Sequence, residues 1–124
     1  MEKPAPSPAI LAKKVRIVAK LEAVLSADAV ISDEAETRAY ECDGLTAYTC
    51  PPLCAVLPST TEEVSAVLKI CHDEGVPVVP RGSGTSLAGG ALPTADSVIL
   101  GVARMNDVID VSIEDRTIRV QTGR

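Results

Sequence analysis

The sequence predicts a mixed fold in which a helical lead-in precedes a strand–helix–strand unit and further strands. Apolar residues recur at helical spacing over the first 25 residues, whereas short apolar runs bounded by glycine and proline prevail after residue 52. A glycine-rich stretch, residues 80–91, lies between two of the expected strands. The length of 124 residues suits one modest domain.

The lead-in is assigned to residues 1–51. Residues 1–7 are expected to form a flexible tail, and a helix is expected to start at Ser7-Pro8, because serine can cap a helix and proline fits its first position. The helical pattern ends near Ser26, and a second short helix is predicted over residues 33–40. The basic residues of the first helix are interpreted as a solvated face: Lys13, Lys14, Arg16 and Lys20.

A strand–helix–strand unit follows the lead-in. The first strand is predicted over residues 54–57, and Thr60 with Glu63 forms a capping box at the start of the helix. Gly75 ends the helix, and residues 76–79 form the second strand. A connection this short predicts a right-handed crossover between parallel strands.

The main domain, assigned to residues 52–124, continues with more strands. One is predicted over residues 97–102, and residues 108–113 and 117–122 are predicted to pair as a hairpin joined at 114–116. The chain stops directly after this hairpin, so we expect it to be a fragment of something longer.

Composition and charge argue against several classes of partner. The net charge is −5 and aromatic residues make up 2% of the chain, whereas nucleic-acid binding recruits basic and stacking side chains. No apolar run approaches the roughly 18 residues of a membrane-spanning segment. Four cysteines come without a secretory signal, so a cytoplasmic location with reduced thiols is expected.

The cysteines do not predict a metal site. Cys50 and Cys54 are separated by three residues, which is wider than the spacing of most zinc knuckles. Cys71 and His72 are neighbours on the predicted helix and point in different directions. Cys71 also belongs to the apolar stripe of that helix, so it is predicted to lie in the core.

The glycine-rich stretch is the candidate functional motif. Glycine permits unusual backbone dihedral angles, so successive N–H groups can converge on one anion, most often a phosphate. The Walker pattern needs lysine where Gly90 stands, and the dinucleotide pattern needs glycine where Leu87 stands. Both patterns also need a helix directly after the loop, and Pro93 with the β-rich run that follows argues against one. A flexible connection without a ligand is the alternative.

Four runs of sequence occur in a specific order: YECDGL at 40–45, VLPSTTEEV at 56–64, GVPVVPRGSGTSL at 75–87 and GGALP at 89–93. Together they resemble the FAD-linked oxidases of the vanillyl-alcohol oxidase and p-cresol methylhydroxylase (PCMH) type. The first and last runs look most like the FAD subunit of glycolate oxidase and its D-lactate dehydrogenase relatives. The resemblance extends from about Leu21 to Arg124.

This resemblance implies an α+β fold, with FAD between two small subdomains of which this chain supplies the N-terminal one. It implies that the loop cradles the FAD pyrophosphate, with these cofactor-binding residues: Pro80, Arg81, Gly82, Ser83, Gly84, Thr85, Ser86, Gly89 and Gly90. Some members attach the flavin through a histidine a few residues after the loop arginine. That region reads Gly84-Thr85-Ser86 here and the only histidine is His72, so non-covalent FAD is expected.

The resemblance also implies an enzyme that oxidises a 2-hydroxy acid, of the glycolate or D-lactate type, to the 2-oxo acid. Electrons would pass to a quinone, another subunit or oxygen, and other glycolate oxidase subunits are the implied partners. The residues that bind the substrate and assist proton removal would follow Arg124, so no catalytic residue is named. The alternative is a truncated, non-catalytic remnant or interaction module that does not bind FAD alone, whose exposed strand edges over 108–122 invite pairing with another chain.

Side chains in and beside the loop each have two candidate roles. Arg81 either offsets phosphate charge or ties the loop to a neighbouring carboxylate. Thr85 and Ser86 either donate hydrogen bonds to phosphate or satisfy the backbone of a turn. Asp43 either lies near the flavin or caps a loop.

Overall fold

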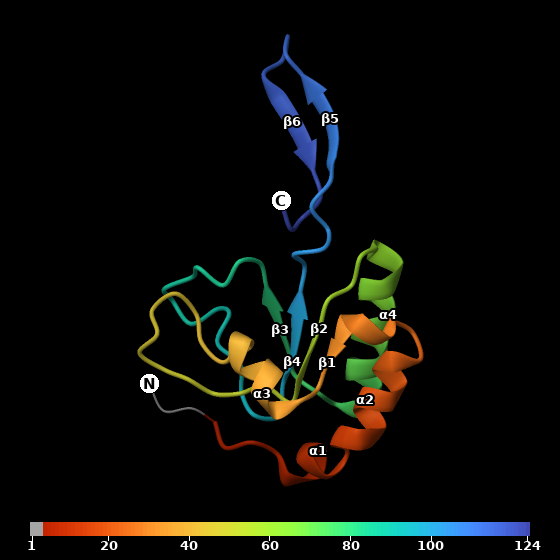
Figure 1. Cartoon of the computed structure of the whole chain (residues 1–124), viewed down its shortest axis with the longest axis vertical. Helices are drawn as coiled ribbons and strands as arrows, with labels where there is room; N and C mark the ends of the chain where they lie inside the picture. Colours follow the sequence, from red (N-terminus) through yellow and green to blue (C-terminus); the bar gives the residue numbers. More distant parts are fainter. Residues whose placement is uncertain (1–3) are drawn as a thin grey trace.

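A four-stranded sheet forms the centre of the computed structural model, which describes residues 4–124 (Figure 1). Its strand order is β1-β2-β4-β3, where β1 pairs antiparallel with β2 and the other pairs are parallel. The strands are β1 (Val30–Ile31), β2 (Cys54–Val56), β3 (Val78–Arg81) and β4 (Val98–Gly101). The short strand β1 has no counterpart among the sequence predictions.

The predicted strand–helix–strand unit consists of β2, α4 (Thr61–Glu74) and β3. Its two strands run parallel, but they are not neighbours, because β4 lies between them. The connection from β3 to β4 is the stretch 82–97, which carries the chain back to the amino end of a parallel neighbour without a helix. Residues 82–91 of the glycine-rich stretch therefore belong to a long crossover loop, and Pro80 and Arg81 form the end of β3.

Both ends of α4 follow the predicted chemistry, with one difference. The Thr60 hydroxyl accepts a hydrogen bond from Glu63 N at 3.2 Å, as in a capping box. The Glu63 carboxylate, however, accepts from Ser59 N at 2.6 Å, one residue before the cap. Gly75 ends the helix in the left-handed region with φ 69°, where a side chain would be strained.

The first predicted helix is two helices. They are α1 (Pro8–Ala12) and α2 (Lys14–Glu22), which break at Lys13. Pro8 occupies the first helical position, but the Ser7 side chain caps nothing; its backbone N–H donates to Asp96 Oδ2 at 2.8 Å instead. The expected flexible tail is thus tied down at Ser7, and residues 1–3 lie outside the described part of the chain.

The remainder of the lead-in contains short elements. A 3-10 turn (Ala27–Ala29) precedes β1. The predicted second helix is α3 (Glu34–Thr37), continued by a 3-10 turn (Arg38–Tyr40). Asp33 caps α3 by accepting hydrogen bonds from Ala35 N and Glu36 N.

The basic face of α1 and α2 is not simply solvated, which corrects the sequence interpretation. Three of its residues surround the Glu74 carboxylate at the end of α4, whose side chain is 3% exposed. Arg16 Nη2 lies 3.0 Å and Lys13 Nζ 3.9 Å from this carboxylate, and Lys20 Nζ donates a hydrogen bond to it. These ion pairs attach the lead-in to α4.

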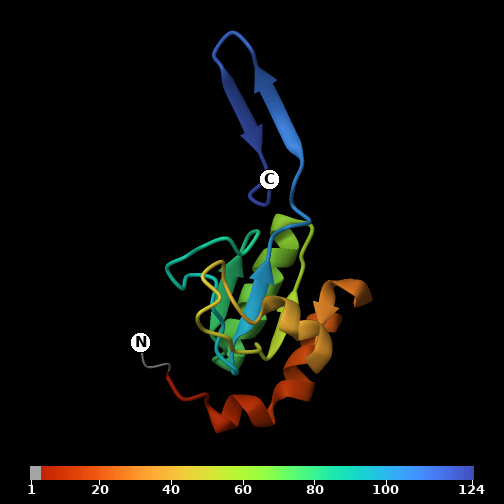
Figure 2. The same cartoon turned by 60° about the vertical axis from the view of Figure 1, so that its left-hand side comes forward.

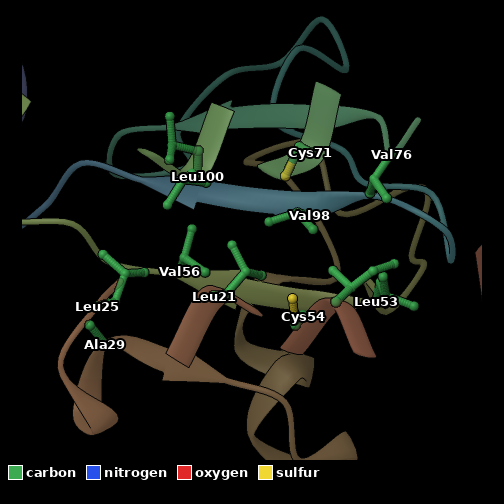
Figure 3. Packing of buried hydrophobic residues seen from close by; sticks show 12 residues of the cluster. Leu21, Leu25, Ala29, Leu53, Cys54, Val56, Cys71, Val76, Val98 and Leu100 are labelled. Carbon is green, nitrogen blue, oxygen red and sulfur yellow. The ribbon is translucent and has the colours of Figure 1, made fainter. Parts of the chain in front are cut away.

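One hydrophobic core joins the lead-in to the main domain. Leu21 of α2, Val56 of β2 and Val98 of β4 are fully buried in the same cluster (Figure 3). Cys71 of α4 lies in this cluster with 1% exposure, so its predicted core position is confirmed. The division at residue 52 stays a prediction, and the two parts share this core.

The predicted hairpin is confirmed as β5 (Val108–Ser112) and β6 (Thr117–Val120), an antiparallel pair with an irregularity between Val108 and Asp110. Figures 1 and 2 both show it extending away from the sheet and helices. Among residues 4–124, no helix combines the length and the apolar character that crossing a membrane requires.

Candidate functional site

The glycine loop, defined here as residues 82–90, begins at the carboxyl end of β3. In open sheets with parallel strands, ligands bind beyond the carboxyl ends of the strands. The loop lies beside the connection between α3 and β2 (Figure 1), and backbone contacts join the two: Gly44 N donates to Ser86 O at 2.9 Å. We call residues 40–45 of that connection the support segment.

The loop presents a row of unused backbone donors. The N–H groups of residues 82–86 have no hydrogen-bond acceptor anywhere in the described chain, residues 4–124. All of these residues are exposed or half-buried. Gly84 has φ 73°, a left-handed conformation that turns the row. Successive free N–H groups around such a turn form an anion-binding nest.

Of the two glycines at the end of the predicted site, Gly89 and Gly90, only Gly89 forms hydrogen bonds within the described part of the chain. Gly89, with φ 82°, donates its N–H to Asp43 Oδ2 at 2.9 Å, and its carbonyl accepts from Leu92 N at 3.1 Å. Gly90 N has no acceptor among the described residues. Pro80 lies in β3 opposite Leu100 and has no N–H to offer.

The Arg81 side chain lies between the glycine loop and the support segment. Its Nη1 donates to the carbonyl oxygen of Cys42 at 2.7 Å, and its guanidinium carbon lies 5.7 Å from the centroid of the Tyr40 ring. A Cβ added to Gly84 would overlap the guanidinium group. Two roles were considered for Arg81: offsetting phosphate charge, or tying the loop to a neighbouring carboxylate. The structure shows Arg81 tying the loop to its neighbour, although the partner is a backbone carbonyl group and not a carboxylate.

Asp43 caps the loops, which is one of its two predicted roles. The residue is 6% exposed, and its Oδ1 accepts from Leu45 N at 3.0 Å while Oδ2 holds Gly89. Next to it, a Cβ on Gly44 would lie 2.8 Å from the carbonyl oxygen of Thr85. Tyr40, the Cys42 carbonyl and Gly44 are contributors that sequence reasoning did not identify, although they lie in the YECDGL run.

The hydroxyl groups of the loop differ from each other. Ser86 Oγ accepts a hydrogen bond from Ala88 N at 3.3 Å, which satisfies the turn. Thr85 is exposed, and its hydroxyl group has no partner among the described residues. Both residues therefore keep an O–H group that can donate to a ligand, because Ser86 acts only as the acceptor in its hydrogen bond.

Two of the four thiols, those of Cys54 and Cys71, are buried in the core. Burial raises the pKa of Cys54 to about 12 and that of Cys71 to about 11, so both thiols stay protonated at neutral pH. Within residues 4–124, no three or more metal-ligating side chains gather as a candidate metal site.

The family described as FAD binding domain matches residues 52–124. Glycolate oxidase subunit GlcD of Escherichia coli K12 is 47% identical over 94 residues, which are 76% of this chain and 19% of that protein. D-2-hydroxyglutarate dehydrogenase of Xanthomonas citri pv. viticola is 36% identical over 92 residues, 74% of this chain and 20% of that protein. The mitochondrial D-lactate dehydrogenase [cytochrome] 1 of Saccharomyces cerevisiae is 47% identical over 75 residues, 58% of this chain and 13% of that protein.

This chain thus spans a fifth or less of the length of these relatives. Among solved structures, alkyldihydroxyacetonephosphate synthase superposes with a TM-score of 0.76 at 22% identity, covering 99% of this chain and 24% of that one. p-Cresol methylhydroxylase with bound substrate gives a TM-score of 0.69 at 23% identity, covering 89% and 22%. These structural likenesses confirm the predicted PCMH-type fold.

Proposed function

The chain belongs to the FAD binding domain family, and on this premise we propose that its glycine loop forms the wall of the FAD site that holds the pyrophosphate. The predicted resemblance to FAD-linked oxidases of the PCMH type is thereby confirmed. FAD is the cofactor that this family binds, and the position of its phosphates on this chain is our proposal.

The row of free N–H groups at residues 82–86 is the observation that carries the proposal. A diphosphate is negatively charged, and this chain is negatively charged as well, with a net charge of −5, so overall charge does not attract the ligand. Backbone dipoles can bind such an anion without a cluster of cationic side chains. The exposed Thr85 hydroxyl and Gly90 N–H add further donors beside the row. The residues thus fit the phosphates of FAD through their backbone more than through their charge.

We propose that the FAD is bound non-covalently. The only histidine, His72, lies on α4, and not on the glycine loop. The loop positions after Arg81 carry glycine, serine and threonine. Mass spectrometry of the denatured holoprotein would report any covalent flavin.

For the whole protein, we propose an FAD-dependent dehydrogenase or oxidase acting on a 2-hydroxy acid of the glycolate or D-lactate type. The proposal is supported by relatives named for glycolate, D-lactate and D-2-hydroxyglutarate. When bound, FAD would supply the two-electron acceptor for oxidation of the hydroxyl carbon. The role proposed for this chain is to bind and orient the cofactor. None of its residues is assigned to proton transfer.

Further subunits are part of the same proposal, because the E. coli relative is named as a subunit. A cytoplasmic location stays a prediction from the cysteines. The alternative function, a module that does not bind FAD, is disfavoured by the family match and by the row of free donors.

Titration of the 124-residue chain with FAD, followed by flavin fluorescence and the visible spectrum, tests the proposal. We expect binding below about 50 µM, and at least roughly tenfold weaker binding of riboflavin, which lacks the pyrophosphate. ADP should compete with FAD, because it shares the diphosphate. Absence of FAD binding would favour the non-binding alternative. Equal affinity for FAD and riboflavin would contradict the proposed role of the glycine loop in binding the pyrophosphate.

A further inference from the structure

Three hydrogen bonds join the glycine loop, together with Arg81 directly before it, to the support segment. Arg81 Nη1 donates to Cys42 O at 2.7 Å, and Gly44 N donates to Ser86 O at 2.9 Å. Gly89 N donates to Asp43 Oδ2, also at 2.9 Å. The free N–H row of residues 82–86 lies between the first and the last of these attachments. The row is therefore held at both ends while its own donors stay unused.

The guanidinium group of Arg81 fills the space on the inner side of the loop. It contacts the Gly84 backbone closely enough that a Cβ there would overlap it, and it lies over the Tyr40 ring. Arginine is suited to this position because its planar group can stack and donate in a fixed direction at once, whereas a lysine ammonium is a point charge. An arginine committed to these partners supports the loop from within.

Asp43 supports the other end of the row. Its carboxylate is nearly excluded from solvent, and both oxygens accept backbone N–H groups, one from each loop. Hydrogen bonds to an ionised acceptor are about twice as strong as neutral ones. The carboxylate thus joins Leu45 of the support segment to Gly89 of the glycine loop.

We propose that Arg81 and Asp43 are positioning residues that preorganise the glycine loop, and that Arg81 does not itself contact the pyrophosphate. The identity of the ligand in this proposal rests on the proposed function, whereas the hydrogen bonds of Arg81 and Asp43 do not depend on it. A loop already ordered in the free protein loses less conformational entropy when an anion binds. The support segment therefore contributes to FAD affinity without touching the phosphates.

Amide hydrogen exchange on the free chain tests the geometry without FAD. In Arg81→Lys, which keeps the charge but not the planar group, the Gly44 and Gly89 N–H groups should exchange roughly tenfold faster, as expected for losing a hydrogen bond with a charged group. Asp43→Ala should release Gly89 in the same way. Arg104→Lys is the matched control, because Arg104 pairs with Asp28 on the surface. The buried amide of Ile99 in β4 checks that each variant is folded.

A second measurement separates positioning from direct contact. We expect Arg81→Gln to bind FAD about tenfold more weakly while the dependence of the dissociation constant on sodium chloride stays as in the parent chain. A direct ion pair with phosphate would be screened by salt, so its loss would flatten that dependence.

Unchanged exchange at Gly44 and Gly89 in Arg81→Lys would overturn the proposal, and so would a flattened salt dependence in Arg81→Gln. If the parent chain does not bind FAD, the proposed function fails, and the exchange experiment still decides whether Arg81 and Asp43 hold the loop.

Discussion

Gly44 shows how a single residue depends on space more than on backbone conformation. Its Cβ, if present, would lie 2.8 Å from Thr85 O, which is backbone and cannot move aside cheaply. We expect Gly44→Ala to lower the free energy of unfolding by about 1–3 kcal/mol, the usual range for overpacking. Urea denaturation followed by circular dichroism measures the change.

Gly82→Ala is the matched control for stability. No atom lies within 4 Å of a Cβ at Gly82, and its φ is outside the left-handed region. The expected change is within about 0.5 kcal/mol. If both variants lost the same stability, the close approach of the two loops at Gly44 would be wrong.

The roles of single residues in the site could be predicted only in part. Glycines, hydroxyl residues and the flanking strands indicated a phosphate loop, because that signal is local in sequence. The partners of Arg81 and Asp43 lie 39 and 46 residues away along the chain, so no local pattern encodes them. The sequence therefore left two roles open for each residue. The tertiary contacts show that Arg81 ties the loop to the Cys42 carbonyl and that Asp43 accepts backbone N–H groups from both segments.

At the scale of elements, the pairing of α1 and α2 with α4 depends on Glu74. The hydrogen bond from Lys20, and then the charges of Arg16 and Lys13, hold the pKa of Glu74 below its ordinary value of 4.5, although burial acts in the opposite direction. A carboxylate whose pKa is lower in the folded state stabilises the fold above its unfolded pKa. That contribution is lost as the pH falls through the folded pKa.

We therefore expect the stability of the parent chain to decline more steeply than that of Glu74→Gln as the pH falls from 7 to below the ordinary pKa of 4.5. Thermal unfolding at a series of pH values measures both profiles. Glu22→Gln, at an exposed position at the end of helix α2, should keep the parental profile. Parallel profiles for the parent chain and Glu74→Gln would contradict a stabilising role of the Glu74 charge.

The same elements show what sequence patterns can predict. The capped helix α4, the short α3 and the hairpin were all predicted, because capping, turn and periodicity signals act within a few residues. The insertion of β4 between β2 and β3 was not, since strand order arises from long-range pairing. The basic face of α2 was taken as solvated for the same reason: Glu74 lies 54 residues from Lys20.

At the scale of the whole molecule, the hairpin has an apolar face that nothing in the described chain covers. Val108 pairs with Val120 and Val111 with Ile118, whereas Asp110 pairs with Arg119 and Ser112 with Thr117. Directly opposed residues share a face, so the apolar pairs lie together and the polar pairs lie on the other side. The four apolar side chains are 36% to 61% exposed. Such a face, bounded by unpaired strand edges, favours association.

We expect the isolated chain to self-associate through this face, and Val111→Thr combined with Ile118→Thr to make it monomeric while retaining the strand preference. Size-exclusion chromatography with light scattering, from about 5 to 200 µM, would show a mass that rises with concentration only for the parent chain. Thr117→Ser, on the polar face of the same hairpin, should behave like the parent. A parent chain that stays monomeric throughout would refute the prediction. An assembly that persists in the double variant would point to another surface, because the two most exposed of the four apolar side chains would then be polar.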